Sequence, residues 1–227
     1  MAGASMKDIK LRIKSVESTM QITKAMELVA SSKLRKAKER QERCRPYFTG
    51  LKQTLESIET ATHDFSSPYQ QHREVKKRCL IVIAGDRGLA GGYNSNVFKS
   101  VQPMLEEGSV CVLPIGKRTV DFFARNGIEM LTTEFAEAAS VSVSDCFTIS
   151  NLITKGYLNG QYDEVSVVYT RFVSMLTQTP AHDVLLPLEK LEGKAETGVR
   201  QLVLYEPSPS AVYDAIVPNY IAGMIYG

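Results

Sequence analysis

An uninterrupted heptad pattern decides the fold of this chain. Residues 9–58 read IKLRIKSVESTMQITKAMELVASSKLRKAKERQERCRPYFTGLKQTLESI. Steps of four and three residues alternate along a seam, and twelve of its fifteen positions are apolar or small. These positions are Ile9, Ile13, Val16, Met20, Thr23, Glu27, Ala30, Leu34, Ala37, Gln41, Cys44, Phe48, Leu51, Leu55 and Ile58. A repeat of about 3.5 residues sustained in this way predicts a coiled-coil helix, because it keeps one stripe turned toward a partner helix.

The predicted helix is long and not uniform along its length. About fifty helical residues span roughly 75 Å, which exceeds the diameter of a small domain, so we expect the helix to contact a partner outside its own core. Residues 22–30 are apolar nearly all round, and such a segment is typical of an enclosed helix. Pro46 lies inside the pattern, and we expect a kink or short break near Arg43–Pro46.

The charge of the chain is concentrated on this helix. Residues 6–45 contain twelve Lys and Arg against five acidic residues, a net charge of +7, although the whole chain carries only +2. The remainder is therefore slightly acidic, at −5. A basic helix beside an acidic body predicts an acidic partner along the helix.

Composition limits the remaining classes of protein. The chain has 227 residues, 44% of them hydrophobic, which is enough for one sizeable core besides the long helix. Its four cysteines contain no CxxC pair, so we expect reduced, buried thiols and no metal site. No apolar run is long enough to span a membrane, and residues 1–5 are too short for a signal peptide.

After the helix the pattern changes to alternating strands and helices, which predicts a Rossmann-like α/β domain. We expect the long helix in residues 1–62, a polar connector in 63–77, the α/β domain in 78–206 and the start of a C-terminal helix in 207–227. Buried parallel strands are predicted at Cys79–Ala84, Val110–Ile115 and Glu164–Tyr169. Val184–Leu188 and Gln201–Tyr205 are predicted as further strands and are the candidates for an edge of the sheet. Helices are predicted at Ser95–Glu107, Lys117–Asn126, Asp145–Asn159 (capped by Asp145 and ended by Gly156 or Gly160) and Ala211–Tyr226.

A glycine-rich loop at Gly85–Asn94 sits between a strand and a helix, where phosphate groups bind in nucleotide-binding proteins. Its spacing matches neither GxGxxG nor a Walker loop, so the sequence favours a tight structural turn over a nucleotide site. Asp86 and Arg87 could form an ion pair within it. His63, His72 and His182 lie in polar contexts away from any nucleophile motif, and we expect no catalytic site.

The basic cluster at Lys33–Arg40 admits a nucleic-acid interpretation, as in a basic region that runs into a zipper. The heptads begin before this cluster and continue through it, which favours a helix flank that faces solvent or a protein. Three hypotheses follow: a mechanical subunit of a larger enzyme, a stand-alone coiled-coil protein that binds an acidic partner or nucleic acid, and a small-molecule enzyme.

The two most distinctive stretches of the chain are Gln21–Ala37 and the loop Asp86–Asn94. Both closely resemble stretches of the gamma subunit of F-type ATP synthases. Ile9–Val16, Arg45–Tyr47, Leu185–Leu188 and Tyr205–Pro207 also match, so the resemblance covers the whole chain. Gly85 and Ala90 depart from the residues common in the family. The insertion of the chloroplast members is absent, which indicates a bacterial type.

The resemblance implies a central-stalk rotor without a catalytic site or cofactor of its own. In that family, an N-terminal and a C-terminal helix coil together inside the alpha/beta hexamer, while the α/β domain lies near the epsilon subunit and the c-ring. Members continue past residue 227 with the partner helix, so we expect this chain to hold only its start. The family location implies the cytoplasmic face of the bacterial plasma membrane, with peripheral attachment.

The resemblance also implies two sets of contact residues. The acidic lever loop of beta would meet Lys24 and Met26, and the same ring would meet the run that contains Lys33, Arg35 and Lys36. The c-ring would meet Tyr205 and Glu206.

Overall fold

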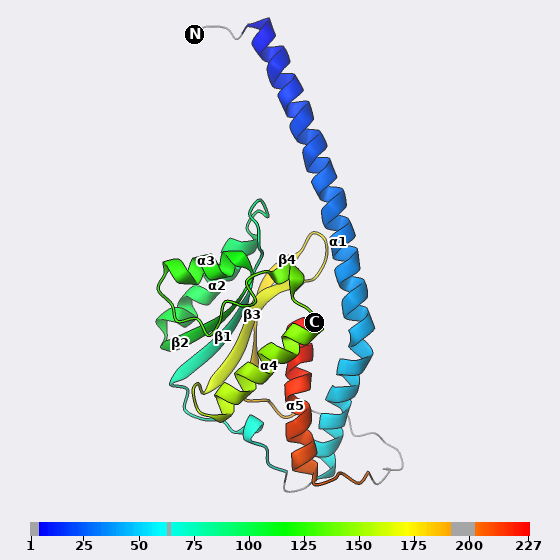
Figure 1. The fold of residues 1–227 in the computed structure, drawn as a ribbon, viewed down its shortest axis with the longest axis vertical. Coiled ribbons are helices and arrows are strands. Elements are labelled where there is room, and N and C mark those ends of the chain that lie inside the picture. Colours follow the sequence, from blue (N-terminus) through cyan, green and yellow to red (C-terminus); the bar gives the residue numbers. More distant parts are fainter. Residues whose placement is uncertain (1–4, 63–64, 192–202) are drawn as a thin grey trace. The chain divides into compact units, whose positions relative to one another are not determined.

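The computed structural model describes residues 5–62, 65–191 and 203–227, and it contains both the long helix and the α/β domain (Figure 1). The chain divides into two compact units, Met1–Pro46 and Tyr47–Gly227. The first helix, α1, covers Met6–Ala61 and therefore belongs to both units. The predicted start near Met6 is confirmed.

Of the kink or short break predicted near Arg43–Pro46, the break does not occur, because helix α1 continues through Pro46. Proline already has the φ angle of a helix, and its main cost is the lost hydrogen bond to the carbonyl of residue 42. Both Pro46 and Glu42 are exposed, so water can hydrogen-bond that carbonyl.

The second unit is built on a four-stranded sheet with the order β2-β1-β3-β4. The strands are β1 (Lys77–Ile83), β2 (Ser109–Ile115), β3 (Glu164–Phe172) and β4 (Gln178–Leu186). The first three are parallel, as predicted, whereas β4 runs antiparallel to β3 at the edge. The prediction found only the apolar end of β4, because its first part is polar and largely exposed.

Helices cover both faces of the sheet (Figure 1). Helices α2 (Tyr93–Glu106) and α3 (Lys117–Arg125) pack on one face, and α4 (Val143–Leu158) and α5 (Pro209–Tyr226) pack on the other. Two short 3-10 helices, η1 (Pro68–Gln70) and η2 (Ala138–Ser140), lie in the connections. The result is a three-layer α/β domain of Rossmann-like type, as the alternating pattern predicts.

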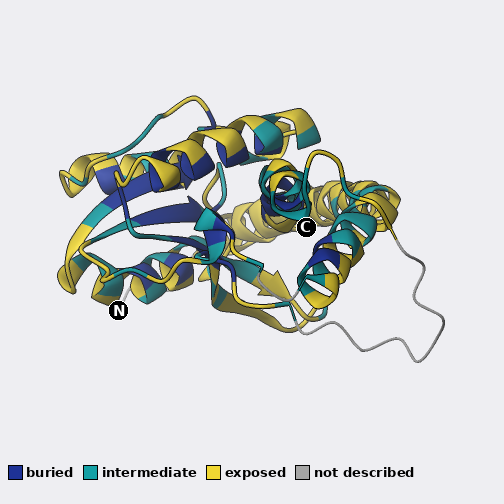
Figure 2. Ribbon diagram, turned by 90° about the horizontal axis from the view of Figure 1, so that it is seen from below, coloured by how far each residue is buried: buried dark blue, intermediate teal, exposed yellow. Residues whose placement is uncertain are grey.

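Two apolar clusters fill the space between these layers. Figure 2 shows the buried residues on the strands and on helix faces turned toward them. The smaller joins Leu80 and Val82 of β1 to α2 and α3. The larger joins the opposite face of the sheet to α4, α5 and the end of α1. Alternation along each strand sends successive side chains to opposite clusters, which explains why the continuous apolar runs are buried on both sides.

Two local predictions need correction. Ser142, not Asp145, is the N-cap of α4; its hydroxyl accepts from the Asp145 N–H, and Asp145 closes a capping box. Of the two glycines predicted to end this helix, Gly160, at φ +69°, follows its end as one alternative had it, whereas Gly156 lies within the helix. The strand predicted at Gln201–Tyr205 is not formed over residues 203–205, and residues 201–202 lie outside the described part of the chain.

Candidate functional site: the surface of the long helix and the glycine loop

The first half of α1 exposes its large apolar side chains, both those on the seam and those beside it. Met26 is 51% exposed and Leu28 67%, in the segment where apolar side chains surround the helix. The other large apolar residues exposed in this half are Met6, Ile9, Leu11, Ile13, Val16, Met20, Ile22 and Val29. An exposed apolar stripe of this length is typical of a surface that binds another protein.

Basic side chains flank this stripe. Lys24, Lys33, Arg35 and Lys36 are all exposed. Arg35 approaches Glu39 one turn later, at 4.0 Å between Nε and Oε1, but a pair this exposed contributes little energy. The positive charge of the helix is thus presented to solvent and is available to an acidic partner.

The same seam is covered in its last turns. Leu55 and Ile58 are fully buried in the larger cluster, together with Tyr213, Val217 and Ile221 of α5. Within the second unit, therefore, α5 is the partner helix that the heptad pattern requires.

The contact between the two helices is close at one point. A Cβ atom added to Gly223 would lie 2.2 Å from Cδ1 of the Phe48 ring. The absence of a side chain at this position lets α5 approach the aromatic residue of the seam.

The Glu59 carboxylate links helices α1 and α5 to other segments of the second unit through hydrogen bonds. Glu59 of α1 accepts hydrogen bonds from Gln70 Nε2 at 2.7 Å, from the Tyr213 hydroxyl at 2.6 Å and from the Leu191 N–H at 2.9 Å. Burial and the neighbouring Glu59 carboxylate raise the pKa of Tyr213. No sequence motif marks this site, because its four residues lie in separate segments of the chain.

The second predicted contact region precedes α5. Tyr205 is half-buried and packs against the larger cluster, while Glu206 is exposed. The helix that follows is capped by Ser208, whose hydroxyl accepts from the Ala211 N–H. Tyr205 and Glu206 belong to the second unit, whereas Lys24, Met26, Lys33, Arg35 and Lys36 belong to the first.

The glycine loop is a tight turn that the Asn94 side chain stabilises. Asn94 accepts from the Gly85 N–H at 2.8 Å and donates to the Arg87 carbonyl at 3.1 Å. Leu89 is 95% exposed and has a φ of +62°, a conformation that glycine adopts more readily. The loop therefore presents an apolar side chain to solvent from a backbone position that is unfavourable for leucine.

The carboxylate of Asp86 lies at the N-terminus of α3. Its carboxylate accepts from the N–H groups of Lys117, at the start of α3, and of Ala138 and Ala139 in η2, at 2.8–3.2 Å. The ion pair between Asp86 and Arg87 considered from the sequence is not formed; the carboxylate binds these three N–H groups instead. A helix N-terminus attracts an anion, and here the chain supplies its own.

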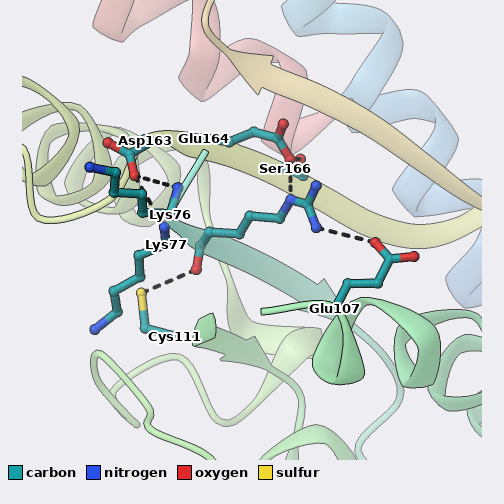
Figure 3. Close-up of polar contacts among 8 residues, drawn as sticks. Lys76, Lys77, Glu107, Cys111, Asp163, Glu164 and Ser166 are labelled. Carbon is teal, nitrogen blue, oxygen red and sulfur yellow. Dashed lines mark hydrogen bonds and ion pairs between the residues drawn. The ribbon is translucent and has the colours of Figure 1, made fainter. Parts of the chain in front are cut away.

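Other polar contacts cluster at the end of the sheet where strands β1 and β2 begin (Figure 3). Asp163 accepts from the N–H groups of Lys76 and Lys77, which lowers the pKa of its carboxyl group. Arg78 forms ion pairs with Glu107 and Glu164, at 3.3 and 3.2 Å. This network joins the strand ends to one another.

The described residues contain no cluster that could hold a metal ion. His72 and His182 are exposed, in agreement with the prediction, and His63 lies outside the described residues. Within the same part of the chain, no helix is both long and apolar enough to cross a lipid bilayer.

Comparison with known proteins identifies the class. A family model described as ATP synthase matches residues 5–227. The structure is also similar to a central-stalk and c-ring structure of the Tetrahymena thermophila mitochondrial ATP synthase, with a TM-score of 0.61 and 21% identity, covering 90% of this chain and 89% of that one. The chain is thus an ATP synthase subunit whose fold is that of the central stalk.

Relatives identify the subunit. The chain is 42% identical over 228 residues to the ATP synthase gamma chain of Ruminococcus albus, covering 98% of this chain and 79% of the relative. It is 45% identical over 235 residues to that of Alkaliphilus metalliredigens, covering 99% and 80%. The chain therefore belongs to the ATP synthase gamma chain family. The comparisons give no support to a stand-alone nucleic-acid-binding protein.

Proposed function

We propose that this chain couples rotation of the c-ring to ATP synthesis or hydrolysis in the alpha/beta hexamer. It acts without a catalytic site of its own, in contact with the alpha, beta and epsilon subunits and the c-ring. The complex holds it peripherally at the cytoplasmic face of a bacterial plasma membrane. The exposed apolar seam of α1 with its basic flank carries this proposal. Such a surface fits a helix that rotates inside a ring of partner subunits whose acidic loops face it.

Coupling of this kind is a linkage between shaft orientation and partner conformation. A shaft that binds one beta conformation more tightly than another shifts the populations of those conformations as it turns. Apolar side chains suit such contacts because the hydrophobic effect is non-directional, which allows the helix to move past its neighbours. Exposed positive charge adds attraction to acidic loops at any orientation.

Particular residues serve these contacts in the proposal. Lys24 and Met26 meet the acidic lever loop of beta, and Lys33, Arg35 and Lys36 meet the same ring. Tyr205 and Glu206 meet the c-ring. The exposure of all five α1 side chains and of Glu206 supports this assignment.

The test is a comparison of pumping with hydrolysis in the reconstituted complex. Met26→Lys places a new charge against a close-fitting partner surface, where burying it is costly. We expect less ion pumping per ATP hydrolysed, measured by dye quenching in vesicles alongside phosphate release.

Gln53→Lys is the matched control, because Gln53 lies exposed on the same helix outside the apolar segment 22–30. We expect this control to keep the normal ratio. If Met26→Lys also keeps it, the proposed close fit at Met26 is wrong.

A further inference from the structure

Two cysteines lie opposite each other on neighbouring strands. Cys79 of β1 is in register with Cys111 of β2, and the strands are parallel. Both side chains belong to the larger apolar cluster, so both point to the same face of the sheet. The proposed rotor function uses neither residue.

The spacing of a sheet brings the two residues within reach of a covalent bond. Neighbouring strands lie ~4.8 Å apart, and disulfides join Cα atoms roughly 4.4–6.8 Å apart. The Cys111 thiol donates a hydrogen bond to the carbonyl of Arg78, the residue before Cys79, at 3.6 Å (Figure 3).

The environment makes the two thiols unequal. The neighbouring Cys79 thiol and the nearby Lys77 ammonium lower the pKa of Cys111. The neighbouring Cys111 thiol and burial raise the pKa of Cys79. Cys111 therefore forms a thiolate first, and the thiolate is the nucleophile in thiol oxidation.

Both cysteines lie close to the first residues of their strands. Cys79 is the first buried residue of β1, after the half-buried Lys77 and Arg78. Cys111 is the first buried residue of β2, after the exposed Ser109 and half-buried Val110. On its outer side, β2 is bridged to Met130 only at Val112, one residue after Cys111. Fraying of the first two residues of β2, which precede this bridge, would admit a small oxidant to Cys111.

We propose that Cys79 and Cys111 form a reversible oxidation site for hydroperoxides. The Cys111 thiolate attacks one peroxide oxygen, the O–O bond breaks, and a sulfenic acid forms as the leaving oxygen takes a proton. The Cys79 sulfur then attacks the Cys111 sulfur, the S–O bond breaks, and water leaves with the Cys79 proton. The two thiols lose two electrons in total, and the peroxide is reduced to water or to water and an alcohol.

The resulting disulfide should be easy to reduce. Disulfides favour a Cβ separation of roughly 3.5–4.5 Å, so closing the bond draws two parallel strands closer than their ordinary spacing. Strained disulfides are labile and belong to reversible rather than structural bonds.

The other two cysteines serve as internal controls. Burial and the neighbouring Asp145 raise the pKa of Cys146 to about 12, so its thiol stays protonated near neutral pH. Cys44 is half-buried on α1, in the first unit. Neither has a register-paired cysteine.

The experiment treats the full 227-residue chain with hydrogen peroxide at neutral pH, blocks free thiols, and maps non-reduced peptides by mass spectrometry. We expect a linked peptide pair that contains Cys79 and Cys111, with both thiols recovered after dithiothreitol. A Cys44→Ser/Cys146→Ser variant should give the same linked pair, and Cys111→Ala should leave Cys79 reduced.

The proposal is overturned if Cys79 and Cys111 remain free while Cys44 is oxidised. It is also overturned if either is oxidised without the linked pair, or if Cys79 is oxidised equally in the Cys111→Ala variant. The measurement on the unmodified sequence needs no substitution, so a variant that fails to fold does not remove the test.

Discussion

The carboxylate of Glu59 should contribute strongly to the stability of the second unit, and Glu59→Gln is the perturbation that shows it. The change keeps the size of the side chain but replaces one acceptor oxygen with an NH2 group. Three donors converge on the carboxylate, from Gln70, Tyr213 and Leu191. An amide oxygen can accept two of these bonds, so the third donor then faces the NH2 group.

The expected loss follows from the value of one such bond. A hydrogen bond to a charged group contributes about 1.5–3 kcal/mol, and Glu59 is partly exposed, so we expect a loss of about 2 kcal/mol. In a protein of this size that corresponds to roughly 4–8 °C in Tm. Tyr213→Phe should cost about 1–2 kcal/mol, and the double variant less than the sum, because both changes remove the same bond.

The assay is urea unfolding of the full chain followed by tyrosine fluorescence, since the chain has ten tyrosines and no tryptophan. Glu56→Gln is the matched control, because Glu56 lies one turn earlier and pairs only weakly with Lys52, at 3.6 Å. We expect the control to change stability by less than about 0.5 kcal/mol. If Glu59→Gln is no more destabilising than Glu56→Gln, or if the double variant is fully additive, the network does not hold the helices to the domain.

Two further changes test packing and electrostatics. Gly223→Ala should destabilise the protein by about 1–3 kcal/mol, because the added Cβ meets the Phe48 ring. Gly50→Ala should stabilise it by about 0.4–1 kcal/mol, because a Cβ at Gly50 meets nothing within 4 Å. Thermal melts measure both changes, and equal effects would refute the close approach at Gly223. Asp163 has a lowered pKa, so its contribution is present above its unfolded pKa of about 3.9 and is lost as the pH falls through the folded value. Asp163→Asn should therefore be destabilising at pH 7 and nearly neutral at the acid end of a series of urea melts, and a constant difference across pH would contradict this.

The sequence predicts those parts of the fold that depend on local pattern. The apolar runs of β1, β2 and β3 are continuous because both faces of a parallel strand are buried, so the runs are visible without tertiary information. The start of α1 at Met6 follows from the heptads in the same way. The polar half of β4 has no such signal, because at an exposed edge polar residues can form a strand as well as a loop.

The parts that depend on contacts between distant segments were not predictable. The sequence suggested Asp86 as a partner of Arg87, but its carboxylate binds the N–H groups near α3 and η2. Glu59 reads as one more charged residue beside the seam until Tyr213 is brought to it. The pairing of Cys79 with Cys111 requires the strand register. In each case the partner is fixed by topology and not by spacing in the sequence.

The heptad seam shows why exposure, and not pattern, marks the functional surface. Its positions follow one rule, yet Leu55 and Ile58 are buried against α5 while the large apolar residues from Ile9 to Val29 are exposed. These exposed side chains retain about half of their surface, so covering them would release on the order of 10 kcal/mol, from about 1.5–3 kcal/mol for each fully buried residue. Association costs an estimated 4–15 kcal/mol, so the apolar seam alone gives little surplus. The basic flank that includes Lys24, Lys33 and Lys36 would supply the attraction and partner selection that the apolar contacts lack.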